Sequence, residues 1–295
     1  MEIAIHTLRA VAFAIVDPSN AFILIMIAVI FYNKNKKTAA MQKMIMGESL
    51  DSPFELTISQ IVMGIFAGTV ASLLFTFSGL VFDENSNIYL LFMVSLFFMA
   101  FKPRFICFSY SGAVLGMASL VFKYAASILH MPQLNIINID ILTLMTLVGI
   151  LHIIEGILVM IDGSRGAIPV FTNRDQKIIG GFALKRYWAL PIALLILLSA
   201  SSAELAVGQN FMMAEWRGLI KGDIVNRIVK SSVIASMALY GVIGYSSITF
   251  TKLKKKKALT SGALVLTYGI VLTAVSQLAV RSEEHTSELQ SPVRS

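Results

Sequence analysis

The sequence has little charge and almost no cysteine. Only 14% of its 295 residues are charged and 56% are hydrophobic, whereas a soluble domain usually carries about 25% charged residues. The single cysteine, Cys107, excludes a disulfide framework and a CxxC metal or redox site. With a mean hydropathy of +0.77, these shortages exclude a water-soluble enzyme, a disulfide-rich secreted domain and a disordered chain.

The sequence also lacks the common motifs of catalytic and nucleotide-binding sites. It contains no HExxH, no GxSxG, no Walker A motif and no GxGxxG. We therefore predict that the protein is not an enzyme. We also predict no catalytic residues, no metal site and no cofactor.

Long apolar runs fill most of the chain instead. Because a helix needs about 20 apolar residues to cross a bilayer, we predict an all-α, polytopic transmembrane helix bundle of about eight spans. The expected spans lie at about residues 21–32 (extended back across Ser19), 58–82, 88–101, 105–129, 139–161, 188–207, 231–250 and 259–280. Residues 1–16, which carry His6 and Arg9, would reach only about 24 Å as a helix. They predict an N-terminal interfacial or re-entrant helix that stops at Asp17.

The C-terminal residues read as foreign sequence. Residues 281–291 are RSEEHTSELQS, which is the translation of a common sequencing-library adapter. We therefore interpret residues 281–295 as an adapter-derived artefact. Residues 1–280 are predicted to be an integral membrane helical domain whose C-terminal continuation is missing.

Basic residues alternate from loop to loop. They follow the first, third, fifth and seventh predicted spans, for example at Lys43, Lys102, Arg174 and Lys255, and they are absent after the second and fourth spans. Since basic loops stay in the cytoplasm, we predict a multi-pass protein of the cell membrane with these four loops cytoplasmic.

Two other basic segments need their own interpretation. Residues 208–230 mix basic and large apolar side chains, which predicts an amphipathic helix on the outer membrane surface. The run after the seventh span is predicted to be an anchor to anionic lipids and a topology signal rather than a nucleic-acid site. It consists of Lys252, Lys254, Lys255, Lys256 and Lys257.

One pair of ionisable residues lies inside a predicted span. His152 and Glu155 are three residues apart, so they share a helix face with Gly149 and Gly156 that should turn toward other helices. Such a pair can be a mutual hydrogen bond that fixes the helix in the bundle, a proton relay, half of a metal site or a substrate contact. The first interpretation is favoured, because no second HxxE or further acidic residue supplies the missing ligands.

Small residues recur at four-residue spacing on two predicted spans. Gly64, Gly68 and Ser72 form one small-xxx-small face, and Gly112 and Gly116 form another. Such faces let helix backbones approach closely. They predict helix packing within the chain, with a homo-oligomer contact as the alternative.

Four segments together resemble a known family. They read SPFELT at 52–57, PRFIC at 103–107, LHIIEG at 151–156 and GGFALKRYWALP at 180–191. In this order they resemble the membrane half of the Firmicutes membrane-anchored PDZ-domain proteins, the group of MinJ-like division-site scaffolds. The resemblance covers nearly all of residues 1–280 and implies a PDZ domain downstream, which this sequence does not contain.

Two classes of function are compatible with these observations. The resemblance implies a non-catalytic membrane scaffold that localises or recruits cell-division or envelope proteins. The alternative is a multi-span transporter or permease that uses the region of His152 and Glu155. A transporter should show an internal repeat with interrupted spans, and none is evident, which favours the scaffold. The expected partners are the lipid bilayer and division or envelope proteins, but no nucleic acid. A homo-oligomer is the alternative interpretation of the glycine faces.

Overall fold

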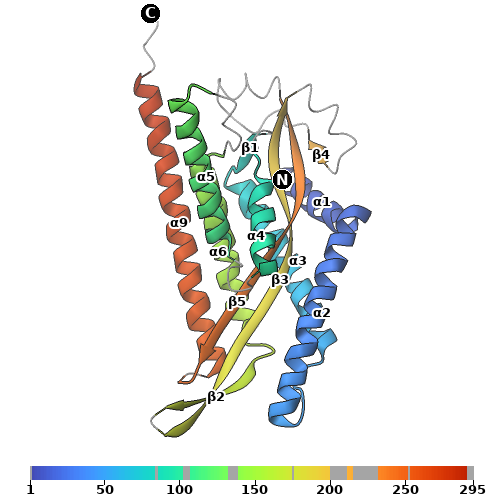
Figure 1. Cartoon of the computed structure of the whole chain (residues 1–295). Coiled ribbons are helices and arrows are strands. Elements are labelled where there is room, and N and C mark those ends of the chain that lie inside the picture. Colours follow the sequence, from blue (N-terminus) through green and yellow to red (C-terminus); the bar gives the residue numbers. More distant parts are fainter. Residues whose placement is uncertain are drawn as a thin grey trace, which may run out of the picture.

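The computed structural model describes residues 2–83, 86–101, 107–131, 139–174, 176–199, 211–214, 232–251 and 253–290. These residues form seven helices and a mixed five-stranded sheet (Figure 1). In chain order the elements are α1 (Glu2–Val16), α2 (Pro18–Met46), α3 (Pro53–Phe77), β1 (Val81–Asp83), α4 (Tyr89–Phe101), α5 (Phe108–Ile128), α6 (Ile141–Asp162), β2 (Ile168–Arg174), β3 (Lys177–Ser199), β4 (Phe211–Ala214), β5 (Ser232–Thr249) and α9 (Lys254–Gln290).

The prediction of an all-α bundle of eight spans is wrong. The apolar runs expected to be the sixth and seventh spans form β3 and β5, which pair antiparallel from Phe182↔Thr249 to Ser199↔Ser232. β2 pairs with the start of β3, β1 pairs parallel with its end, and β4 pairs with β5. Of the predicted surface helix at 208–230, only β4 lies within the described residues.

The reason for this error is that a continuous apolar run does not distinguish a buried helix from a strand buried on both faces. In β3, Trp188, Ala189 and Leu190 are all fully buried, so both faces of the strand are covered. The composition of β5 carried a contrary signal. Eight of its 18 residues are β-branched or aromatic, and Gly241 and Gly244 interrupt the run, a combination that favours strand over helix.

Four helices are long and apolar enough to cross a membrane: α3, α5, α6 and the Lys254–Val280 part of α9. They correspond to the predicted second, fourth, fifth and eighth spans. α1 and α2 meet at a bend of 67°, so the predicted separate N-terminal helix is present. The bend coincides with Asp17, whose side chain accepts a hydrogen bond from the Asn20 amide at the start of α2.

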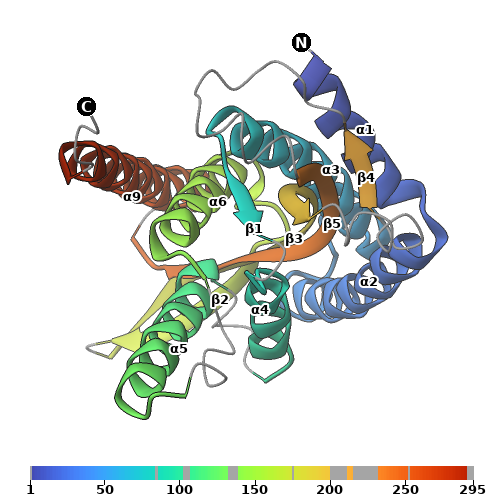
Figure 2. The ribbon, with the colours of Figure 1, turned by 90° about the horizontal axis from the view of Figure 1, so that it is seen from above.

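The β3–β5 ribbon lies in the middle of the molecule and the helices surround it (Figure 2). The main hydrophobic core joins side chains of α3, α4, α5 and α6 to those of β3. A smaller cluster joins Ile27 and Phe31 of α2 to Tyr187 and Tyr240 of the ribbon. The helices therefore cover the apolar faces of the strands.

The small face of α3, formed by Gly64, Gly68 and Ser72, packs against an edge of β3 rather than against another helix. On the edge of β3 that faces away from β5, the described residues include no strand partner between Leu184 and Leu194. Helix α3 lies along this part of the edge. A Cβ atom on Gly64 would come 2.0 Å from the Ala189 carbonyl oxygen, and one on Gly68 would come 2.2 Å from that of Pro191. The Ser72 hydroxyl accepts a hydrogen bond from the Ala193 amide at 2.9 Å.

The spacing of these contacts follows from the geometry of the two elements. Four residues of helix rise about 6.0 Å, and two residues of strand rise about 6.6 Å. Each step of four residues along the small face of α3 thus meets the next residue of β3 whose backbone carbonyl or amide points to this edge. Pro191 fits at this edge because it has no amide hydrogen to leave without a partner.

Helices α6 and α9 pack in close antiparallel contact through glycines. A Cβ atom on Gly156 would come 2.7 Å from the Gly262 carbonyl oxygen, and one on Gly269 would come 2.7 Å from that of Gly149. Next to this contact, the Thr146 hydroxyl donates to the Ser276 hydroxyl at 2.9 Å. The expectation that the Gly149 and Gly156 face turns toward another helix is therefore confirmed.

Candidate functional site

The predicted polar pair lies in the middle of α6 and faces the protein. His152 is only 5% exposed, and its Nε2 atom lies 3.9 Å from Oε2 of Glu155. The side chain of Glu155 is 13% exposed. The structure therefore brings the two predicted residues together, at a distance that is long for a direct hydrogen bond.

The orientation of the His152 ring is fixed from two sides. Its Nδ1 atom lies 2.7 Å from the Val148 carbonyl oxygen, which can only accept, so Nδ1 carries the hydrogen and donates. The ring also meets the Tyr268 ring of α9 edge-on, with 5.2 Å between the centroids. The neutral tautomer therefore presents the lone pair of Nε2 to the groups that lie around it.

Two side chains from the start of α5 converge on the same nitrogen. The Cys107 Sγ atom lies 3.3 Å from His152 Nε2, and the Ser109 Oγ atom lies 3.0 Å from it. Cys107 is the residue that precedes the first turn of α5, with an extended backbone. The thiol, the imidazole nitrogen and the Glu155 carboxylate all lie within 4.8 Å of one another.

Sequence reasoning missed Cys107 as a member of this cluster. Forty-five positions separate Cys107 from His152, and no local spacing connects them. Only the position of Cys107 at the head of a predicted span, opposite the polar pair of a neighbouring span, could have suggested the contact.

A cavity of about 290 Å³ lies beside the cluster, between α5, α6 and α9. The absent side chains of Gly112 and Gly116 leave space in its wall, which is otherwise mostly apolar. Ser109 and Tyr268 line the cavity and also contact His152. The predicted packing face of α5 therefore turns toward α6, where Val148 lies near Gly112 and Leu144 near Gly116.

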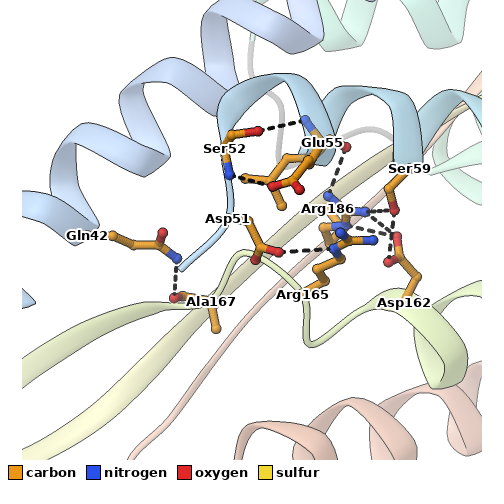
Figure 3. A network of polar contacts seen from close by, with 10 residues as sticks. Gln42, Asp51, Ser52, Glu55, Ser59, Asp162, Arg165, Ala167 and Arg186 are labelled. Carbon is orange, nitrogen blue, oxygen red and sulfur yellow. Dashed lines mark hydrogen bonds and ion pairs between the residues drawn. The ribbon is translucent and has the colours of Figure 1, made fainter. Parts of the chain in front are cut away.

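A second polar site connects the end of α6 to β3 (Figure 3). Arg186 is 1% exposed and forms an ion pair with Asp162. The Arg186 Nε atom donates to Asp162 Oδ2 at 2.9 Å, and Trp188 Nε1 donates to the same oxygen at 2.9 Å.

Groups from α3 complete this network. The Arg186 guanidinium donates to the Ser59 hydroxyl at 2.9 Å and to the Leu56 carbonyl oxygen at 3.3 Å, while Ser59 donates to Asp162 Oδ1 at 3.3 Å. Burial lowers the pKa of Arg186, and the adjacent Asp162 carboxylate opposes this shift. Arginine nevertheless remains charged in proteins, so the site is a buried ion pair with its hydrogen bonds made inside the chain.

From the sequence, Asp162 and Arg186 belonged to the polar loop after the fifth span. The structure buries both, because β3 begins inside that stretch and returns Arg186 to the end of α6. Near them, an exposed pair joins Arg165 to Asp51 at 3.4 Å, and Ser52 and Glu55 cap α3 by reciprocal hydrogen bonds (Figure 3).

The predicted lipid anchor lies at the start of α9. Lys254, Lys255, Lys256 and Lys257 form its first turn, and Lys252 lies outside the described residues. Lys254 also approaches the Phe182 ring, with its Nζ atom 6.0 Å from the centroid. Four cations at a helix N-terminus are unfavourable to the helix dipole. Helix stability therefore does not explain why these lysines lie at the start of α9.

Comparisons with protein-family models, with curated proteins and with solved structures found no match to this chain.

Proposed function

We propose that the chain is a multi-pass, non-catalytic anchor of the cell membrane that localises or recruits division or envelope proteins. The observation that carries this proposal is the distribution of basic residues at the ends of the elements. Lys43 lies in the last turn of α2, Arg174 ends β2, Lys177 begins β3 and Lys254 begins α9. These element ends gather at the lower end of the molecule in Figure 1, opposite β1 and β4.

Contacts support this grouping of the basic ends. The Gln42 amide of α2 donates to the Ala167 carbonyl oxygen next to β2 at 2.9 Å, and Lys254 of α9 approaches Phe182 of β3. Basic residues at one end and apolar helices above them are the pattern of a membrane protein whose basic end is cytoplasmic. The lysines at the start of α9 would then lie among anionic lipid headgroups, which attract their positive charges.

The polar groups of the interior favour an anchor over a permease. Arg186 and Asp162 are engaged with each other and with Ser59, Leu56 and Trp188. The cavity beside His152 is lined mostly by apolar side chains, whereas a transport path for a polar solute requires polar groups along its wall. A permanent buried ion pair fits a rigid structural role.

The membrane part of this proposal can be tested by reporter fusions. Reporters placed after Lys43, after Arg174 and after Lys255 should be active in the cytoplasm. Reporters at Asn85 and Gln133, which lie outside the described residues, should be active on the opposite side. Reporter activity on the opposite side at every position would contradict the orientation. Extraction of the chain from membranes without detergent would contradict the membrane assignment.

The recruiting role is tested by localisation in cells. A fluorescent fusion of the chain in a rod-shaped Firmicutes host should concentrate at division sites, because the resembling family acts there. As a matched control, a fusion of an unrelated multi-pass membrane protein should label the whole membrane evenly. An intact fusion of this chain with the same even distribution would contradict recruitment to division sites. Flux of a solute through liposomes that contain the purified chain would instead favour the permease.

A further inference from the structure

We propose that Cys107, His152 and Glu155 form a binding site for a divalent transition-metal ion, with Zn²⁺ as the expected species. The three residues bring a sulfur, an imidazole nitrogen and a carboxylate oxygen within 4.8 Å of one another. These are the ligand types that Zn²⁺ takes in proteins, whereas a sulfur ligand disfavours Mg²⁺ and Ca²⁺. The site is independent of the anchoring role proposed above.

The separations of the three atoms suit one ion bound between them. Zinc lies about 2.3 Å from sulfur and about 2.0–2.2 Å from nitrogen or oxygen, so two ligands at a tetrahedral angle are about 3.3–3.6 Å apart. The observed separations are 3.3 Å from Cys107 Sγ to His152 Nε2 and 3.9 Å from Nε2 to Glu155 Oε2. Small changes of the Glu155 side chain would bring the carboxylate within coordination distance.

The hydrogen bond on the far side of the ring prepares His152 to act as a ligand. Nδ1 donates to the Val148 carbonyl oxygen at 2.7 Å, which leaves the lone pair of Nε2 directed at the thiol and the carboxylate. Metal-binding histidines usually donate their second nitrogen to a carbonyl or carboxylate in this way. Ser109 Oγ, 3.0 Å from Nε2, can hydrogen-bond a water molecule in the fourth position of the ion.

Charge balance favours a divalent cation at this place. A thiolate from Cys107 and a carboxylate from Glu155 carry two negative charges, and a neutral His152 adds none. An ion of charge +2 would neutralise the site, which matters next to the buried His152 because unpaired charges are costly away from water. The Cys107 and Glu155 side chains are partly buried rather than fully enclosed by the chain.

A catalytic Cys–His dyad would place its carboxylate differently. In such a dyad the thiol occupies one imidazole nitrogen, and the orienting group occupies the other. Here the Val148 carbonyl occupies Nδ1, as an orienting group would, but the Glu155 carboxylate lies on the Nε2 side together with Cys107. Two potentially anionic groups on the same nitrogen indicate a cation between them rather than a nucleophile and its base.

The test uses the full chain purified in detergent, with Zn²⁺ and Co²⁺ as probes. After dialysis against metal-free buffer and titration, we expect a single Zn²⁺ ion to resist competition by a chromophoric chelator. Co²⁺ should show a thiolate-to-metal charge-transfer band. Cys107→Ser and Glu155→Gln should weaken Zn²⁺ binding by about 100-fold or more, because changes to groups that only support metal ligands already cost 10–100-fold. Ser109→Ala should cost about 10-fold or less.

Matched controls are the same replacements at residues outside the cluster. Glu48→Gln, in the exposed turn after α2, and His130→Gln, after α5, should leave the affinity unchanged, whereas His152→Gln should abolish it. Glu155→Gln keeps the shape of the side chain and removes only its charge, so it decides the matter even if Cys107→Ser does not fold.

Three results would overturn the proposal. The first is Zn²⁺ binding by the wild type that is no tighter than binding by Glu155→Gln. The second is a Co²⁺ complex without the thiolate band. The third is rapid acylation of Cys107 by an electrophilic probe that excess Zn²⁺ does not slow, which would assign the cluster to nucleophilic chemistry.

Discussion

The His152 cluster and the Asp162–Arg186 network differ in how completely their polar groups are satisfied. Asp162 accepts hydrogen bonds from Arg186, Trp188 and Ser59, so that network is closed within the chain. At His152, by contrast, a thiol, a hydroxyl and a carboxylate surround a single nitrogen. A closed network holds elements together, and an excess of ligand groups around one point can bind something. Polar residues with similar burial therefore have different expected roles.

The largest effect is expected from breaking the closed network. Asp162→Asn keeps the shape of the side chain but leaves the Arg186 charge buried without its counter-charge, which should cost about 3–5 kcal/mol of unfolding free energy. Titration with SDS in mixed micelles, followed by circular dichroism, measures this. The double variant Asp162→Leu with Arg186→Met should be less destabilised than Asp162→Asn. A cost below about 1 kcal/mol for Asp162→Asn would contradict a structural role for the ion pair.

The next effect concerns the contact between α3 and β3. Gly64→Ala would place a Cβ atom 2.0 Å from the Ala189 carbonyl oxygen, and overpacking of this kind should cost about 1–3 kcal/mol. Gly116→Ala is the matched control, since its Cβ atom would lie at an ordinary 3.7 Å from Leu144. The same SDS titration should show no loss for Gly116→Ala. Equal effects of the two variants would contradict close packing of α3 on the strand.

A smaller difference is expected at the open cluster in metal-free protein. Glu155→Gln should cost little, because the amide keeps the shape and polarity of the side chain and can donate to the lone pair of His152 Nε2. Glu155→Leu should cost more, since it removes a polar partner from a buried group, a loss of roughly 1–3 kcal/mol. The difference between the unfolding free energies of the two variants, measured in the presence of a chelator, checks this. Identical stability of both variants would show that Glu155 does not pair with His152 in the metal-free state.

The smallest effect is expected at the surface pair of Arg165 and Asp51. Their side chains are 42% and 24% exposed and 3.4 Å apart. Exposed ion pairs contribute about 0–1 kcal/mol, so Asp51→Asn should change the unfolding free energy within that range. Thermal unfolding monitored at two salt concentrations would check this, because only a small, salt-sensitive change is expected. A loss as large as that of Asp162→Asn would mean that exposure does not distinguish the two ion pairs.

Sequence reasoning could predict elements whose signals are local. The end of α1 before Asp17 and the placement of His152 on an inward face both follow from residues a few positions apart. The capping residues Ser52 and Glu55 are local too, but the predicted span began only at residue 58. The strands could not be predicted in the same way, because the burial of the leucine-rich strand β3 depends on helices that cover both of its faces. Similarly, Cys107 joins His152, and Arg186 joins Asp162, only after distant segments pack. Pro191 and the glycines of β5 were the local signals against helices there.

The contact of α3 with β3 also has a consequence for the order of assembly. Ser72 and Ala193 are 121 positions apart, so α3 is synthesised before its strand partner exists. In the membrane location proposed above, an uncovered strand edge would have amide and carbonyl groups without partners. The ribbon would then close onto helices that are already in place, and the pairing of β3 with β5 should be a late and slow event. Variants of Gly64 would then act twice, by lowering the stability of the finished protein and by delaying its completion.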